Sequence, residues 1–336
     1  MKKLIFLCLL MLLGCEDPFY TKQQDNPEYI FETFWEELDR HYAFFAYTDL
    51  DWSALYKEYR EKVTPATSED ELFHIFDTIL DSLNDPHTIL FAPRGTAGPV
   101  DYFNQFNTNQ IDSIQHYFST YEVINQTFEV GRIKDTNFGY VLIRTFDGDM
   151  EDFQTIQNIF NSFSDIDGLI MDVRSNRGGM ISNTEVILDQ LTDASYQVCQ
   201  FRYRNGPFHS DFSPWINYRI EPENNTTAFQ QPVMVLTNRH CFSACEWFVM
   251  SASALPQVTV IGDTTGGGSG RPILRELPNG WLLRVSNTQT ILPSGKDFQF
   301  TGLSPDIPVS ITAQDALKNK DTILETTIST LKEKVD

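Results

Sequence analysis

Apolar residues recur at helical spacing through the first part of the chain, from about residue 27 to residue 83. The stretches YIFETFWEELDRHYAFF and WSALYKEYREKV both repeat aromatic and aliphatic residues every three to four positions. The stretch SEDELFHIFDTILDSL opens with Ser68 and Glu71 at the spacing of a capping box, which marks the start of a helix. The pattern therefore predicts a small N-terminal helical domain of about three helices within residues 27–92.

Beyond residue 135 the pattern changes to short apolar runs that alternate with helical segments. Strands that alternate with helices form parallel sheets, and both faces of such sheets are covered. We therefore expect an α/β core over residues 93–336, in which residues 93–135 show no pattern that can be assigned. The predicted strands are 139–146, 168–175, 232–238 and 258–262, the predicted helices are 151–163, one ending near 193, one from about 243 and 313–333, and a predicted hairpin pairs 272–277 with 280–287.

The first residues follow neither pattern. Two lysines precede an apolar run, Leu4–Leu13, that is too short to span a bilayer as a mature helix, so residues 1–14 indicate a bacterial secretory signal. The run ends in Leu-Leu-Gly-Cys, which resembles the lipobox of bacterial lipoproteins and implies that Cys15 carries a lipid. Residues 15–26 would then be a polar tether to a membrane of the bacterial cell envelope, on the periplasmic side or the cell surface. An ordinary signal peptide that contains a cysteine is the alternative.

Charge and composition narrow the class of partner. The 336 residues include 46 Asp and Glu against 25 Lys and Arg, a formal net charge of −21. A surface this acidic repels phosphate backbones, so nucleic acid is not an expected partner. Cysteine and histidine show no metal-ligand spacing, and no nucleotide-binding glycine motif is present, so we expect neither a metal nor a cofactor. Three cysteines, Cys199, Cys241 and Cys245, leave open whether a disulfide forms.

Two of the predicted strands end in turns with unusual chemistry. Asn176-Arg177-Gly178-Gly179 follows one strand, and Arg239-His240-Cys241-Phe242-Ser243 follows the next. Reactive groups gather at such strand ends because the following helix presents free backbone N–H groups. A serine on the first turn of a helix, beside glycine N–H groups, is where an acyl-transfer nucleophile gains an oxyanion hole. Serine is also favoured as a helix N-cap, so the local sequence leaves both roles open.

The order of three segments adds a family resemblance. GLIMDVRSNRGG, VLTNRHCFSACEWF and VIGDTTGGGSG resemble the serine peptidases that comprise the C-terminal processing (tail-specific) proteases and the tricorn protease core. The resemblance covers roughly residues 27–336 and implies a crotonase/ClpP-like ββα core of the α/β class. It implies that Ser243 is the nucleophile, and that the oxyanion donors are the N–H of Ala244 and a glycine N–H of the Gly178-Gly179 turn.

The general base depends on which branch of that family the chain resembles. The tail-specific branch uses a lysine in the turn TTGGGSG, but Gly268 stands at that position here. The tricorn-like branch uses a histidine in a motif that NDPHT resembles, which implies His87 as the base. Imidazole can accept the serine proton at neutral pH and return it to the leaving amine. A turn histidine that merely packs is the alternative for His87, and His240 is the rival base.

Supporting groups are less complete. Gln299 stands where many relatives have the acid that helps to orient the histidine, so Gln299 and Glu246 are the candidates for polar support. A glutamine can donate or accept a hydrogen bond but cannot stabilise an imidazolium by charge. The interval 93–135 is shorter than the PDZ module that most tail-specific proteases carry, so we expect that module to be absent.

The resemblance predicts a membrane-anchored serine endopeptidase that hydrolyses peptides or unfolded protein segments. A binding protein without catalysis on the same fold, for an apolar ligand or a peptide, is the main alternative, and Gln299 in place of an acid favours it. An acidic adhesin or structural lipoprotein would explain the tether and the charge, but not the order of the three motifs.

Overall fold

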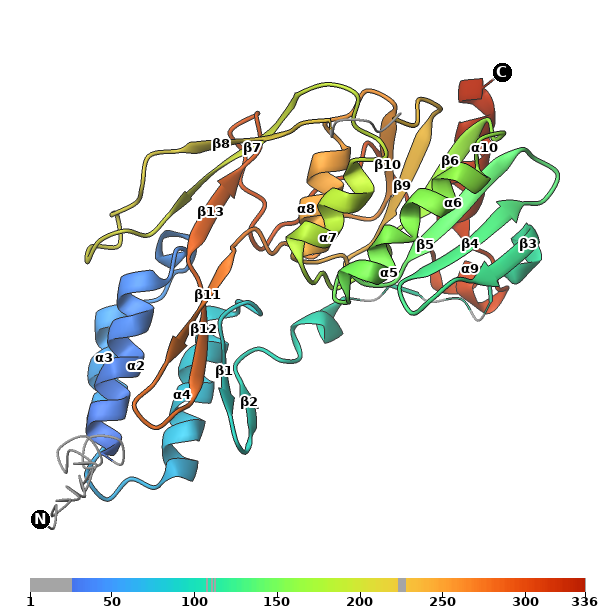
Figure 1. Ribbon diagram of the computed structural model, residues 1–336. Coiled ribbons are helices and arrows are strands. Elements are labelled where there is room, and N and C mark those ends of the chain that lie inside the picture. The colour runs from blue at the N-terminus through green and yellow to red at the C-terminus, as the bar shows by residue number, and fades with distance from the viewer. Residues whose placement is uncertain (1–25, 107, 110, 112, 223–227, 336) are drawn as a thin grey trace, which may run out of the picture.

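The computed structural model describes residues 26–106, 108, 109, 111, 113–222 and 228–335 (Figure 1). The predicted signal peptide, Cys15 and almost all of the predicted tether lie outside the described residues. Among the helices that the structure does describe, none has the length and apolar character needed to cross a membrane.

The N-terminal region contains the three predicted helices, and the capping box of Ser68 and Glu71 is present at the start of the third. A four-stranded sheet in the order β11-β12-β1-β2 shares an apolar core with these helices. The hairpin predicted from late in the chain therefore completes the core of the helical region, so residues 27–92 do not close that core alone. The elements are α2 (Pro27–His41), η1 (Phe45–Tyr47), α3 (Trp52–Arg60), α4 (Glu69–Leu83), β1 (Ile89–Ala92), β2 (Gly95–Ala97), β11 (Pro272–Glu276) and β12 (Leu282–Ser286).

A seven-stranded sheet in the order β14-β10-β9-β6-β5-β4-β3 forms the centre of the larger part of the molecule. The strands from β14 to β5 run parallel, and β4 and β3 extend the sheet as antiparallel strands. Both faces are buried, because residues 233 and 235 of β9 pack into one apolar core and residues 234 and 236 into another. The strands are β3 (Phe118–Val123), β4 (Phe128–Ile133), β5 (Phe138–Ile143), β6 (Gly168–Asp172), β9 (Val233–Thr237), β10 (Val258–Gly262) and β14 (Ile307–Pro308).

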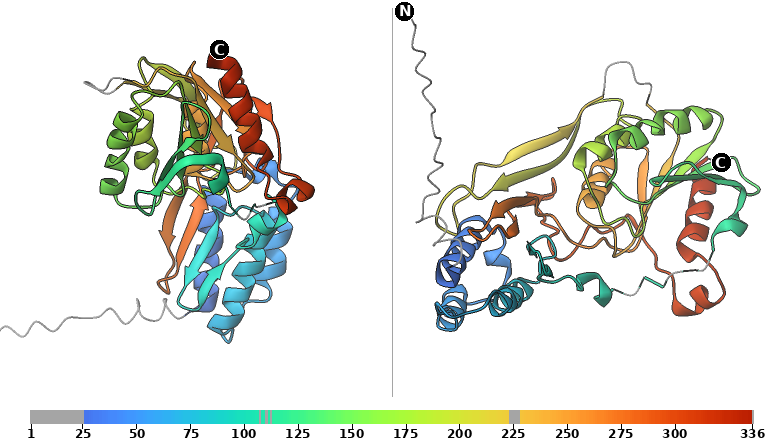
Figure 2. Two further views of the ribbon diagram at one scale, coloured as in Figure 1. Left: turned by 90° about the vertical axis from the view of Figure 1, so that its right-hand side faces the viewer. Right: turned by 60° about the horizontal axis from the view of Figure 1, so that its bottom comes forward.

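Helices cover both faces of this sheet, as the left view of Figure 2 shows. This layering confirms the predicted α/β class. The helix predicted over 313–333 is divided in two, because the chain turns at Asn319 with a φ of 52°, a conformation that asparagine tolerates. One layer contains α5 (Met150–Gln154), α6 (Ile156–Ser162), α7 (Ile181–Leu188) and α8 (Ala244–Ala252), and the other contains α9 (Ala313–Leu317) and α10 (Thr322–Val335).

A third sheet, in the order β13-β7-β8, joins the α/β core to the helical region (Figure 1). Arg204, which directly follows β7, donates hydrogen bonds to the carbonyl oxygens of Tyr42 and Asp39. The sequence pattern predicted neither this sheet nor strands β3 and β4 in the unassigned interval. The remaining elements are β7 (Tyr196–Tyr203), β8 (Ile216–Ile220), β13 (Thr288–Ile291), η2 (Tyr102–Gln105) and η3 (Gln115–Tyr117).

Candidate active site

Ser243 is the last residue of the loop between β9 and α8, so it stands at a helix start, as predicted. Its backbone has φ 59° and ψ −122°, a conformation that residues with a Cβ rarely adopt. The residue lines a cavity of about 620 Å³. A serine held on a strained strand-to-helix turn at the edge of a cavity is typical of nucleophilic serines, because the turn presents the hydroxyl to the substrate.

The turn after β6 packs directly against Ser243. A Cβ on Gly178 would lie 2.7 Å from the carbonyl oxygen of Phe242 and 2.9 Å from the Cβ of Ser243, so the approach requires glycine. The N–H of Gly178 donates to Oδ1 of Asn176 at 2.9 Å and is therefore already engaged. Of the two predicted glycines, only Gly179 is left as a candidate donor.

The N–H groups of Gly179 and Ala244 have no hydrogen-bond acceptor among the described residues, and both residues line the cavity with Ser243. Two unengaged N–H groups beside a hydroxyl can stabilise the negative charge that develops on a carbonyl oxygen under attack. The local geometry therefore fits an oxyanion hole made by residues 179 and 244.

His87 lines the same cavity, although more than 150 residues separate it from Ser243. It stands between a helix and a strand, since α4 ends before Asn84 and β1 begins at Ile89. Its ring centroid lies 4.6 Å from that of Phe242. Both ring nitrogens are buried without a hydrogen-bond partner in the described part of the chain, so no hydrogen bond joins His87 to Ser243. The imidazole nitrogens are therefore free to bond a water or a group of a substrate in the cavity.

Backbone contacts hold the loop that carries His87. Arg284 donates from Nε to the carbonyl oxygen of His87 at 2.9 Å and from Nη2 to that of Pro86 at 2.8 Å. The buried carboxylate of Asp85 accepts the N–H of His87 and the hydroxyl of Thr88, each at 3.0 Å. These contacts fix the loop, but no described carboxylate forms a hydrogen bond with the imidazole nitrogens.

Burial, and then the positive charge of Arg284, lower the pKa of His87 to about 3. The imidazole is therefore neutral at neutral pH, which is the form that a general base requires. Between pH 6.5 and 3 the unfolded chain binds a proton at His87 and the folded chain does not. Protonation therefore favours the unfolded chain, and the free energy of unfolding decreases as the pH falls through this range.

We expect acidification from pH 6.5 to 5 to reduce the free energy of unfolding of the wild type by about 1.5 kcal/mol more than that of His87→Gln. Urea unfolding of both proteins at the two pH values measures the difference. Equal losses in the two proteins would show that the imidazole already binds a proton in the folded state. A kcat/KM profile of the wild type should likewise show no acid limb between pH 6 and 7.

Glu246 and Gln299, the two candidates for polar support, both bind the glycine-rich turn after β10. The carboxylate of Glu246 accepts from the N–H of Ser243, Gly267 and Gly268 at 3.1, 2.8 and 2.7 Å, and from the hydroxyl of Thr265 at 2.5 Å. Oε1 of Gln299 accepts from the N–H groups of Ser269 and Gly270 at 2.7 and 3.1 Å. Glu246 therefore ties the serine turn to the glycine-rich turn, while Gln299 holds the latter and does not bond His87.

The other candidates from the sequence lie outside the cavity. Nε2 of His240, the rival base, is 3.2 Å from the carbonyl oxygen of Phe103. The three described cysteines, Cys199, Cys241 and Cys245, are buried free thiols. Burial raises the pKa of the Cys245 thiol well above its usual range, which disfavours the thiolate that a cysteine nucleophile needs. Within the described ranges, no group of three or more His, Cys, Asp or Glu side chains could hold a metal ion.

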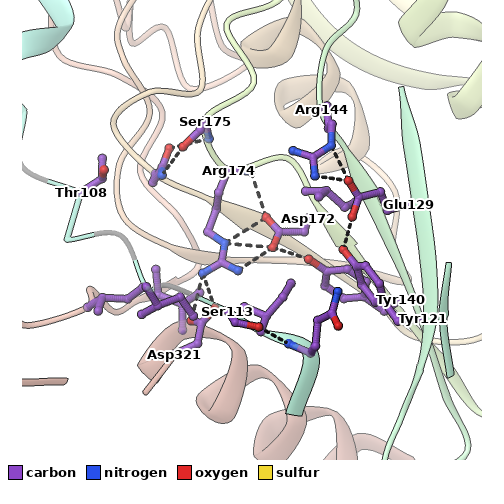
Figure 3. Close-up of a pocket in the computed structure, with 17 residues that line it drawn as sticks. Thr108, Ser113, Tyr121, Glu129, Tyr140, Arg144, Asp172, Arg174, Ser175 and Asp321 are labelled. Atoms are coloured by element: carbon purple, nitrogen blue, oxygen red, sulfur yellow. Dashed lines mark hydrogen bonds and ion pairs between the residues drawn. The ribbon is translucent and has the colours of Figure 1, made fainter. Parts of the chain in front are cut away.

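A second cavity, of about 460 Å³, contains a network of charged side chains (Figure 3). Arg174 lies two residues beyond β6, where its guanidinium pairs with Asp172 at 2.5 Å and with Asp321 at 2.8 Å. The hydroxyl of Tyr140 donates to Asp172 at 2.8 Å. Since Asp321 also caps α10 by accepting the N–H of Leu324, this network connects the loop after β6 to the start of α10.

Two asparagines to which the sequence assigned no role stabilise the turn after β6 and the turn after β9. Oδ1 of Asn238 accepts the N–H of Ser175 at 2.9 Å and the N–H of His240 at 3.0 Å, so one side chain joins both turns. Asn176 bonds Gly178 through Oδ1 and donates from Nδ2 to the carbonyl oxygen of Ile143 at 3.0 Å. The signal was present in the sequence, because each asparagine precedes an arginine in the loop that follows a buried strand.

Two family models match parts of this chain. The model of peptidase family S41 matches residues 137–309, just over half of the chain, and that of the tricorn protease C1 domain matches residues 23–81. The first match includes Ser243 and both turns, and the second covers most of the N-terminal helices.

Related proteins show the same likeness. The carboxy-terminal processing protease CtpB of Bacillus subtilis is 25% identical over 179 residues, and CtpA of the same organism is 22% identical over 236 residues. These matches cover 53% and 68% of this chain but 35% and 46% of the relatives, so the chain spans less than half of their length. The crystal structure of a candidate peptidase from Parabacteroides merdae is 34% identical with a TM-score of 0.81, and the match covers 91% of this chain and 96% of that chain.

Proposed function

This chain belongs to peptidase family S41, and from that premise we propose that it is a serine endopeptidase with Ser243 as nucleophile and His87 as general base. The observation that supports the proposal best is the presence in one cavity of the strained serine, an imidazole with no hydrogen-bond partner, and the unengaged N–H groups of Gly179 and Ala244.

The proposed reaction proceeds through an acyl-enzyme. His87 accepts the hydroxyl proton as Oγ of Ser243 attacks the scissile carbonyl carbon, and the carbonyl oxygen becomes an oxyanion bound by the N–H groups of Gly179 and Ala244. The imidazolium then gives its proton to the leaving amine as the C–N bond breaks. A water molecule, deprotonated by His87, hydrolyses the ester and restores the serine hydroxyl.

Peptides and unfolded protein segments are the proposed substrates. Strand β11 is an outer strand of its sheet, and its first residue, Pro272, lines the cavity. An extended peptide can add to such a sheet edge through backbone hydrogen bonds, which would place its chain beside Ser243.

A fluorophosphonate probe tests the proposal, because it forms a covalent adduct only with an activated serine. We expect an adduct on Ser243 by mass spectrometry, none in Ser243→Ala, and a rate at least about 10²-fold lower in His87→Ala. Ser253→Ala, at the other end of α8, is the matched control and should react like the wild type. Labelling that survives in Ser243→Ala, or its absence at every pH from 6 to 9, would reject the peptidase.

A binding protein on the same fold is the second candidate. It is favoured by one observation, that Gln299 binds the glycine-rich turn and leaves the imidazole without an orienting partner in the described residues. The binder predicts no probe adduct in the wild type, so the same measurement separates the two functions.

We also propose that Cys15 anchors the protein to a membrane of the bacterial cell envelope, on the basis of the lipobox-like sequence. A clickable fatty-acid analogue should label the wild type in its native host, and Cys15→Ser should lose the label and the membrane association together. A membrane-bound but unlabelled wild type would contradict the proposal.

A further inference from the structure

The cavity that holds Ser243 differs in charge from the rest of the molecule. Three arginines, Arg177, Arg271 and Arg284, line it, and none of the described lining residues is an aspartate or glutamate. The whole chain, by contrast, has 46 acidic residues and a formal net charge of −21. A cleft lined by one sign of charge concentrates ligands of the opposite sign.

Two of these guanidinium groups have no anionic partner. Arg177 and Arg271 are exposed, and neither side chain forms a hydrogen bond or an ion pair with the described residues. Other arginines do find carboxylates, since Arg132 pairs with Asp165 at 2.7 Å and Arg275 with Glu37 at 2.6 Å.

Aromatic rings support both groups instead. The guanidinium of Arg177 lies 4.5 Å from the ring centroid of Phe103, and that of Arg271 lies 5.5 Å from the centroid of Trp247. Phe103 and Trp247 themselves line the cavity. A guanidinium on an aromatic face keeps its N–H edge free for a carboxylate, which it can bind through two parallel hydrogen bonds.

The third arginine and the acids that hydrogen-bond to residues of the cavity lining are already engaged. Arg284 donates to the carbonyl oxygens of the His87 loop. Asp85, Glu246 and Asp297 do not line the cavity, and their carboxylates accept hydrogen bonds from backbone N–H groups and hydroxyls. These carboxylates therefore do not pair with Arg177 or Arg271.

The positions of Arg177 and Arg271 relate them to the scissile bond. Arg177 directly precedes Gly178 and Gly179, the turn with the proposed oxyanion donor. Arg271 directly precedes β11, the outer strand whose edge would pair with an extended peptide. Its own backbone is fixed, because its N–H donates to the hydroxyl of Thr288 at 2.7 Å and its carbonyl oxygen accepts from Asn287 at 3.0 Å.

We propose that Arg177 and Arg271 bind a carboxylate of the substrate close to the scissile bond, so that the enzyme selects peptides with an acidic side chain or a C-terminal carboxylate at that position. The inference names the substrate class of the endopeptidase proposed above and rests on that function.

Matched peptides test the selection. One set carries a single Glu at successive positions of a fluorogenic, N-acetylated and C-amidated peptide, a second carries Gln at the same positions, and a third carries Gln with a free C-terminus. At one position of the peptide, we expect kcat/KM of the Glu peptide to exceed that of the matching C-amidated Gln peptide by about 10-fold, or the Gln peptide with a free C-terminus to exceed it by as much. This is the effect of one charge-assisted hydrogen-bond pair. The first result identifies a side chain as the source of the carboxylate, and the second identifies the chain end.

Variants then assign the preference to the two arginines. Arg177→Gln and Arg271→Gln should each reduce the ratio of acidic to neutral kcat/KM toward 1, and Arg271→Glu should favour a Lys peptide over a Glu peptide. Arg40→Gln removes the same charge at an exposed position outside the cavity and should leave the ratio unchanged. Circular dichroism confirms that each variant is folded.

Failure of this inference is distinguishable from failure of the proposed function. A wild-type ratio within twofold of 1, or a preference that survives in both Arg→Gln variants, overturns the inference even if Ser243 is the nucleophile. If no peptide is cleaved, the affinity of the same peptides for Ser243→Ala, measured by fluorescence anisotropy, tests the carboxylate site without hydrolysis. Tighter binding of the acidic peptides that depends on Arg177 and Arg271 supports the carboxylate site and rejects only the peptidase, whereas equal binding overturns the inference.

Discussion

Replacement of Ser243 by glycine is expected to abolish hydrolysis and, at the same time, to give a protein more stable than Ser243→Ala. Both substitutions remove the hydroxyl, so each should lower kcat/KM by at least about 10⁴-fold. They differ in backbone strain, because φ 59° with ψ −122° is accessible to glycine but costly for any residue with a Cβ. We expect the glycine variant to exceed the alanine variant by about 1 kcal/mol in the free energy of unfolding.

Urea unfolding of the two variants measures this difference, and the far end of the same helix provides a matched control. Ser253 has φ −65° and ψ −14°, which is helical, so Ser253→Gly should be less stable than Ser253→Ala by about 1 kcal/mol. If glycine is also the less stable choice at position 243, the strained turn does not exist in solution. If glycine is more stable than alanine at position 243 but less stable at position 253, the backbone that holds the Ser243 hydroxyl in place is strained and reduces the stability of the protein.

The buried parallel strands could be predicted from the sequence because each is a continuous apolar run. Strand β10 has the predicted bounds, and β6 and β9 are shorter than predicted by three residues and two residues. Strands with few buried positions give no such signal. In β3 none of the six residues is buried, and in β8 only Ile220 is, so neither strand could be recognised.

The residues of the site that follow neighbouring strands could be predicted from the sequence. Those that meet through contacts between segments far apart in the chain could not. Ser243 and the Gly178-Gly179 turn follow neighbouring parallel strands, so the sheet necessarily brings them together. His87 was identified as the base only through the family resemblance, because a turn histidine has no periodic signal that reveals its role. The engagement of the Gly178 N–H by Asn176 and the grouping of Arg177 with Arg271 are properties of folded loops, which no local pattern contains.

Loss of the Glu246 carboxylate should be the most damaging change among those behind the active site. This side chain is fully buried and accepts four hydrogen bonds, from Thr265, Gly267, Gly268 and Ser243. Glu246→Ala leaves these donors buried without an acceptor, and each such donor costs about 1–3 kcal/mol. Partial relaxation will recover some of this, so we expect a loss of at least about 3 kcal/mol in stability and a Tm lower by about 6–12 °C.

The same change should reduce activity in the molecules that stay folded. The carboxylate joins the turn of Ser243 to the glycine-rich turn, so its removal frees both sides of the cavity, and kcat/KM should fall at least about 10²-fold below the melting transition. Glu333→Ala, on the exposed face of α10, removes an identical carboxylate and should change stability by no more than about 0.5 kcal/mol. Calorimetry and peptide hydrolysis on the two variants give both readouts. A Glu246→Ala protein that melts with the wild type would mean that these donors find other acceptors. The turn of Ser243 and the glycine-rich turn would then have to be joined by other contacts, such as the hydrogen bond from the N–H of Gly266 to the carbonyl oxygen of Cys241 at 2.7 Å.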